Sequence, residues 1–145
     1  MKFLKLIFSV KYNSTALNVS LLILRLFVGI FMLTHGFPKF QTLISGEEIH
    51  FADPIGLGVI ASYILVVFAE FFCSILLILG IFTRLSTIPL MFSMFVASFI
   101  SHSGDPFSSK ELSLLYMIIF AYIFIMGGGK YSIDNIILGR LSAKK

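Results

Sequence analysis

Charged side chains are scarce in this chain of 145 residues: they make up 12% of it, whereas 58% of the residues are hydrophobic. A water-soluble domain of this size carries about twice that share of charge, because its surface has to face water. The mean hydropathy of +1.01 agrees with this shortage. The composition therefore excludes an ordinary soluble domain and predicts an integral membrane protein with a single domain.

Cysteine and tryptophan are also rare or missing. Cys73 is the single cysteine, so an intrachain disulfide or a CxxC pair cannot form, and a self-contained dithiol oxidoreductase is excluded. We expect Cys73 to be a small packing residue. Because tryptophan is absent, tyrosine must supply any aromatic belt at the membrane interface.

The net charge of +4 comes mostly from the two ends of the chain. In a membrane protein such basic ends set the orientation and attract anionic lipid, so we predict a lipid partner and no nucleic acid. The first 12 residues are basic and partly apolar, which predicts a short interfacial helix rather than a cleaved signal peptide.

Apolar runs of membrane-spanning length predict an all-α, integral membrane four-helix bundle within one domain, residues 1–145. The predicted spans are about 16–36, 54–81, 85–101 and 112–127. We expect the sequence Gly36-Phe37-Pro38 to end the first span. The short Thr83-Arg84 link predicts that the second and third spans form an antiparallel hairpin.

A short interfacial helix is predicted at about 133–138, after the glycines at 127–129. Ser132 is placed to cap it, Asp134 lies in its first turn, and Gly139 is placed to stop it.

Arg25 and Glu70 stand near the centres of the first two apolar runs. A charge at bilayer depth costs several kcal/mol unless something pairs with it, so such residues are functional candidates. The two have opposite signs and lie on neighbouring spans. If these spans run antiparallel, both residues fall at about the same depth. We therefore predict that Arg25 and Glu70 are direct partners.

A second polar layer is expected at the outward ends of the helices. We predict that His35, His102 and Glu111 line one cavity that opens toward the outer leaflet, with Lys39 at its rim. Helical spacing aligns Tyr63 with Glu70 and Tyr122 with Glu111, so the tyrosines can link the two layers. The candidate ligand-binding residues are Arg25, His35, Lys39, Tyr63, Glu70, His102, Glu111 and Tyr122.

Three interpretations of these residues compete. The first is a buried salt bridge that fixes the register of the helices. The second is a site for a polar headgroup such as a quinone, whose carbonyls need hydrogen-bond donors and whose reduction needs nearby titratable groups. The third is metal or haem ligation by His35 and His102. No HxxxH or Glu-x-x-His pattern supports the third, so no metal site is predicted.

With these residues in view, the chain resembles the DoxX family of small four-span membrane proteins. The resemblance covers residues 21–134. It rests on Arg25-x3-Gly29-x5-His35-Gly36-x2-Lys39, Glu70, Leu79-Gly80-x2-Thr83-Arg84, His102, Glu111 and Gly127-Gly128-Gly129-x2-Ser132-x-Asp134.

The resemblance implies a four-helix membrane bundle with a redox role. DoxX-like proteins are linked to a thiosulfate:quinone oxidoreductase, to a terminal quinol oxidase and to a membrane-bound oxidoreductase complex. We therefore expect a multi-pass subunit of the bacterial plasma membrane that binds a quinone-like or lipid headgroup and supports a partner oxidoreductase. It would carry no covalently bound cofactor. The rival hypothesis is a non-catalytic assembly or interaction protein whose polar cluster is structural. The sequence leaves the ligand and the oligomeric state open.

Both termini are predicted to be cytoplasmic. Outside the spans, eight Lys and Arg residues lie on the side of the termini and two on the other side, Lys39 and Lys110. In a Cys73→Ser background, a cysteine placed at Glu48 should react with a membrane-impermeant maleimide only from the outer side, and one placed at Lys130 only from the cytoplasmic side. Reaction at position 48 from the cytoplasmic side alone contradicts this topology.

Overall fold

The structure is a computed structural model, and it describes residues 13–142; the interfacial helix predicted for the first 12 residues lies outside this range. Within the described residues all regular secondary structure is helical. Helices α3, η1 and α4 follow one another as a single span, and α5 continues directly into η2. The elements are α2 (Ser14–Ser45), α3 (Val59–Val67), η1 (Phe68–Cys73), α4 (Ser74–Leu79), α5 (Thr83–Phe95), η2 (Val96–Ser101), α6 (Phe107–Met126) and α7 (Ile133–Ser142).

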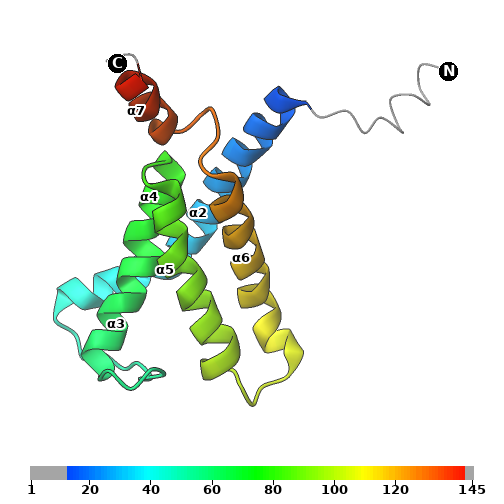
Figure 1. Cartoon of the computed structure of the whole chain (residues 1–145). Helices are drawn as coiled ribbons and strands as arrows, with labels where there is room; N and C mark the ends of the chain where they lie inside the picture. Colours follow the sequence, from blue (N-terminus) through cyan, green and yellow to red (C-terminus); the bar gives the residue numbers. More distant parts are fainter. Residues whose placement is uncertain (1–12, 143–145) are drawn as a thin grey trace.

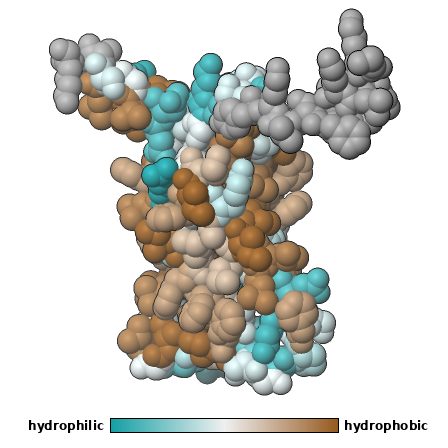
Figure 2. All heavy atoms as spheres, turned by 45° about the vertical axis from the view of Figure 1, so that its right-hand side comes forward, coloured by the Kyte–Doolittle hydropathy of each residue, from teal (hydrophilic) through white to brown (hydrophobic). Residues whose placement is uncertain are grey.

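Four helical segments are long and apolar enough to cross a membrane, which confirms the predicted fold class. They are Ser14–Ser45, Val59–Leu79, Thr83–Ser101 and Phe107–Met126. In Figure 1, α2 crosses the bundle obliquely, α5 and α6 form an antiparallel pair, and the start of α2 lies at the same end as α7. Figure 2 shows apolar residues around the middle of the molecule and hydrophilic residues gathered toward its two ends.

The first span does not end at Gly36-Phe37-Pro38, so this prediction was wrong. Helix α2 continues through Pro38 to Ser45 and ends at Gly46, whose φ is 74°. A proline inside a helix removes one hydrogen bond and disfavours the preceding turn. Here tertiary packing outweighs that cost, because the ring of Phe40 stacks on the ring of Phe71 with 4.2 Å between the centroids.

Gly36 lets α2 approach the second span closely. A Cβ atom at this position would overlap the backbone of Glu70 and Phe71. Small residues at such positions allow the close approach of helices that is typical of membrane bundles. Between α2, α4, α5 and α6 lies the apolar core, which includes Val28, Leu77 and Phe120.

The other helix bounds differ from the predicted spans at loops and turns. The second span begins at Val59 rather than 54, because the residues before it form a turn in which Gly56 and Gly58 have positive φ. Helix α6 begins at Phe107, directly after Pro106. Helix α7 runs through Gly139 to Ser142, so the predicted stop at Gly139 was wrong.

Arg25 is satisfied by backbone carbonyls, and the predicted Arg25–Glu70 pair was wrong. Its side chain is buried, with 1% of the residue exposed. The guanidinium donates to the carbonyl oxygens of Leu77 (3.0 Å) and Ile78 (3.4 Å) at the end of α4. It also donates to those of Gly128 and Tyr131 (3.3 Å) in the turn before α7. The C-terminal end of a helix carries unpaired carbonyls and partial negative charge, which suits a cation.

Asp134 fixes α7 on the turn between α4 and α5. Its carboxylate accepts hydrogen bonds from the backbone N–H groups of Phe82 (2.7 Å) and Thr83 (2.8 Å) and from the Thr83 hydroxyl (2.7 Å). Its own N–H donates to the carbonyl of Gly80 at 2.9 Å. As predicted, the Ser132 hydroxyl caps α7, where it accepts from the N–H of Asn135 at 3.2 Å. We call Arg25, Asp134 and these partners the Arg25 junction.

Replacing Arg25 should destabilise the whole bundle. Arg25→Met leaves the buried carbonyls without a donor, and we expect a loss of roughly 2–4 kcal/mol in the free energy of unfolding. Arg25→Lys should recover only part of this loss, because an ammonium group lacks the planar fork of donors. Unfolding in detergent micelles measures the effect, with the exposed Arg140→Met as control. Equal stability of the Arg25 and Arg140 variants would show that the junction contributes nothing.

Candidate functional site

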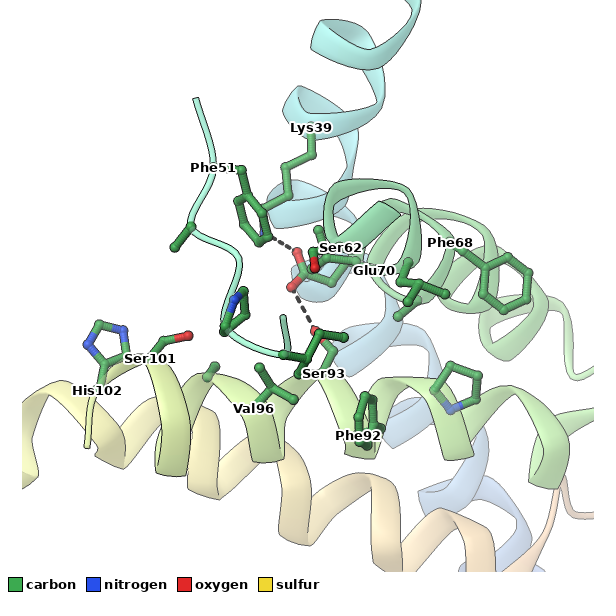
Figure 3. Close-up of a pocket in the computed structure, with 18 of the residues that line it drawn as sticks. Lys39, Phe51, Ser62, Phe68, Glu70, Phe92, Ser93, Val96, Ser101 and His102 are labelled. Atoms are coloured by element: carbon green, nitrogen blue, oxygen red, sulfur yellow. Dashed lines mark hydrogen bonds and ion pairs between the residues drawn. The ribbon is translucent and has the colours of Figure 1, made fainter. Parts of the chain in front are cut away.

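Glu70 forms an ion pair with Lys39. The Lys39 ammonium contacts Oε2 of Glu70, and the Ser93 hydroxyl donates to Oε1 at 3.1 Å. The three side chains come from α2, η1 and α5 and converge on one point (Figure 3). The Glu70 side chain is 6% exposed and that of Lys39 is 30% exposed. A buried carboxylate is thus held by an opposite charge and a hydroxyl donor, which is what a charge in an apolar bundle requires.

The backbone around Glu70 is π-helical. Element η1 contains Glu70 in its first turn, and it is flanked by the α-helical segments α3 and α4. A π-helical turn inserts an extra residue into the ladder of hydrogen bonds, and such turns are frequent at functional sites. The second π-helical element, η2, also lies beside the site, since Val96, Ala97 and Ser101 line the same cavity as Glu70.

A cavity of about 660 Å³ opens beside the ion pair, on the side of α3. We call it the larger cavity. Its charged and polar lining includes Glu70, Lys39, Ser93 and His102, while most of its other lining residues are apolar. These come from α3, η1, α5, η2 and the loop between α2 and α3, and include Phe51, Pro54, Leu65, Phe68, Ile88 and Phe92.

The loop at residues 46–58 closes one end of the larger cavity and runs past the ion pair in Figure 3. Asp53 fixes this loop: it accepts from the Ser62 hydroxyl (2.6 Å) and from the N–H groups of Gly58 (2.7 Å) and Leu57 (3.1 Å). The hydrogen bond from Ser62, with help from the backbone donors, lowers the pKa of the Asp53 carboxyl. The carboxylate therefore stays ionised and the loop stays anchored at neutral pH.

A second cavity of about 280 Å³, the smaller cavity, lies on the side of α6. Lys39, Glu70 and His102 line both cavities, so the ion pair forms part of the wall of each. His35 and Tyr116 line the smaller cavity only, with 6.3 Å between their ring centroids in an edge-on arrangement.

The structure brings five of the eight candidate residues together. Lys39, Glu70 and His102 line both cavities, and His35 lines the smaller one. The buried Tyr63 donates its hydroxyl to the carbonyl of Lys39 at 3.0 Å. His102 also contacts Asp105 through Nδ1 at 2.7 Å.

The other three candidates lie elsewhere. Arg25 belongs to the Arg25 junction, 14 residues before Lys39 on α2. Glu111 is exposed and lines neither cavity, so the predicted cavity contains His35 and His102 but not Glu111. Tyr122 is 41% exposed and does not link the polar layers as we expected. Because the side chains of Glu111 and Tyr122 lie on the outer surface of α6, neither lines a cavity.

Sequence reasoning missed Ser93, Tyr116 and the loop at residues 46–58. The sequence does not single out Ser93, because hydroxyl residues are common along the same helix. In the loop, the apolar residues Phe51, Pro54 and Ile55 stand among polar neighbours, which is a usable signal for a loop that packs on the bundle. Within residues 13–142 no group of three or more His, Cys, Asp and Glu side chains gathers at one point.

Lys39 and Glu70 should stabilise the fold as a pair. Lys39→Met or Glu70→Gln leaves one partner uncompensated, so the double variant should lose less stability than the sum of the single variants. We expect a coupling energy of roughly 0.5–3 kcal/mol in a double-mutant cycle measured by unfolding in micelles. The exposed pair Glu48–His50, 3.8 Å apart, is the control, with an expected coupling near zero. Additive losses for Lys39 and Glu70 would contradict the ion pair.

Comparisons with known proteins agree with this architecture. The family model described as DoxX matches residues 20–103, a range that contains Arg25, Lys39, Glu70 and His102. A protein of Haemophilus influenzae that bears only the description "Uncharacterized protein" is 35% identical over 124 residues, covering 77% of this chain and 86% of that relative. No solved structure gives a significant match. The chain belongs to the DoxX family of membrane proteins.

Proposed function

We propose that the protein is a membrane subunit of a redox system, and that it binds the headgroup of a quinone-like molecule in the larger cavity and supports a partner oxidoreductase. The observation that carries this proposal is the position of a charged pair in the wall of a mostly apolar cavity. Its volume of about 660 Å³ lies within the range of small-molecule sites.

The polar groups of the cavity suit the oxygens of a quinone. A carbonyl oxygen accepts hydrogen bonds, and Lys39 and His102 each carry a donor, whereas the one donor of the Ser93 hydroxyl is already given to Glu70. Only one of the three donors of the Lys39 ammonium is needed for its contact with Glu70. A quinone also takes up or releases protons when it is reduced or oxidised, and Glu70 and His102 are titratable groups in the same cavity wall. The electrons would be exchanged with the partner oxidoreductase.

The contrast with the Arg25 junction supports this location. The guanidinium of Arg25 already donates to four carbonyls, and Arg25 is among the lining residues of neither cavity. The junction is thus a closed structural unit, whereas the Lys39–Glu70 pair faces open space on two sides. A plasma-membrane location follows for a redox subunit that exchanges quinone with the lipid phase.

Binding to a quinone in lipid nanodiscs tests the proposal. The purified wild-type protein should bind a membrane quinone at one molecule per chain, as measured by extraction and chromatography. Lys39→Met and Glu70→Gln should each weaken binding roughly ten- to hundredfold, the cost of removing one charged hydrogen-bonding partner. Glu111→Gln changes an exposed carboxylate outside both cavities and should bind as the wild type does.

Two outcomes would contradict the proposal. If the wild-type protein binds no quinone under these conditions, the polar cavity does not serve a quinone. If the Lys39 and Glu70 variants bind as tightly as Glu111→Gln, the quinone binds elsewhere. In the first case the rival hypothesis of a non-catalytic assembly protein gains support.

A further inference from the structure

The larger cavity opens on the surface of the bundle that faces lipid. Four apolar side chains line this cavity and are themselves 46–54% exposed: Leu65, Phe68, Ile88 and Phe92. Leu65 and Phe68 belong to the second span, and Ile88 and Phe92 belong to the third. We call these four residues the lateral mouth. Phe68 and Phe92 are visible in Figure 3 on the two helices that flank the cavity.

The lateral mouth lies at the depth of the hydrocarbon core. Phe68 is the tenth of the 21 residues in the span Val59–Leu79, and Phe92 is the tenth of the 19 in Thr83–Ser101. Both are therefore near the middle of segments that cross the membrane. In Figure 1, α3 diverges from α5 as it runs away from η1, and the cavity lies between them. At this depth the outside of the mouth is lipid, where an unpaired polar group is costly.

The end of the cavity that lies toward the loops is covered by apolar side chains. Phe51, Pro54 and Ile55 of the loop at residues 46–58 line it there. The Phe51 ring packs edge-on against Tyr63, with 5.3 Å between the centroids. Asp53 holds the loop through three hydrogen bonds. The loop end of the cavity, which His50 and His102 also line, is thus covered by an anchored loop with three apolar side chains, while the lateral mouth opens to lipid.

We propose that the ligand of the larger cavity is a lipid-soluble molecule with a compact ring and a long hydrocarbon tail, and that its tail leaves the bundle through the lateral mouth. This inference rests on the proposed function and specifies its substrate class: a quinone with a polyisoprenoid tail. The ring lies beside Glu70 and Ser93, and the tail remains in the bilayer.

In the wild-type protein the tail should contribute little to the affinity. The mouth and the lipid are equally apolar, so moving a tail between them changes the free energy little. For the wild-type protein we therefore expect a long-tailed quinone and a short-chain analogue with the same ring to bind within a few-fold of each other, once concentrations are expressed per volume of lipid.

Filling the lateral mouth with larger side chains should weaken the binding of the long-tailed quinone but not that of the short-chain analogue. In Leu65→Trp plus Ile88→Trp, two already exposed side chains become larger, so the fold itself is not overpacked. The long-tailed quinone should bind at least roughly tenfold more weakly, because forcing apolar groups into filled space costs on the order of 1–3 kcal/mol. The short-chain analogue should keep its affinity within a few-fold. Each ligand is added during nanodisc assembly, so that its rate of entry does not limit the measurement.

Ile118→Trp is the matched control. Ile118 is 62% exposed on α6 and lines neither cavity, so this variant should bind both quinones as the wild type does. As a second measurement in the wild type, a diazirine on the first isoprene unit of the tail should label lateral-mouth residues, as identified by mass spectrometry.

The outcomes distinguish this inference from the proposed function. If the wild type binds neither quinone, the proposed function fails and the inference fails with it. If the wild type binds both, but the double variant loses both equally or loses neither, the lateral mouth is not the tail's path and the proposed function stands. Diazirine labelling confined to residues 50–55 would likewise overturn the lateral route and place the tail under the loop.

Discussion

Helix α2 carries two cations into an apolar bundle, and the need to satisfy both inside it organises the structure. Arg25 and Lys39 are 14 residues apart, which is about 21 Å along a continuous helix. They therefore cannot share one counterion. Arg25 donates hydrogen bonds to the carbonyls at the end of α4 and in the turn before α7, whereas the charge of Lys39 is neutralised by Glu70. Between these two polar levels, apolar residues of α2 such as Val28 pack in the core.

The family motifs divide between these two levels and have different physical roles there. The Gly80 turn and the segment that ends at Asp134 complete a closed network around Arg25, in which hydrogen bonds join α2, α4, α5 and α7. Gly36 belongs to the other level, where it admits the backbone of η1 and so brings Lys39 to Glu70. The first level is saturated and stabilises the bundle. The second faces two cavities and has donors to spare, so it is the level at which chemistry is available.

The sequence was sufficient to predict the four spans, the tight hairpin and the Ser132 cap, because each depends on apolar length or on neighbouring residues. The sequence was not sufficient to predict which charged side chains pair with each other. Pro38 was taken as a helix end, and the contact that carries the helix past it, Phe40 on Phe71, joins residues far apart in the chain. With the helix ended there, Lys39 was predicted at the rim of the outer cavity rather than as the partner of Glu70. A sequence does not show which backbone carbonyls a side chain will reach, so the acceptors of Arg25 could not be predicted. Glu70 was predicted as its partner because it has the opposite charge at a similar depth.

The positions of the Arg25 acceptors in the chain also determine when, during synthesis, Arg25 can form its hydrogen bonds. Gly128 and Tyr131 follow it by 103 and 106 residues, so the first span is made long before its charge can be satisfied. At roughly 5–20 residues per second, ribosomes need about 5–20 s to reach them. During this interval the guanidinium must reach toward the membrane surface or be sheltered by the insertion machinery. The hydrogen bonds of Arg25 are therefore complete only after the segment that contains Gly128 and Tyr131 has been made.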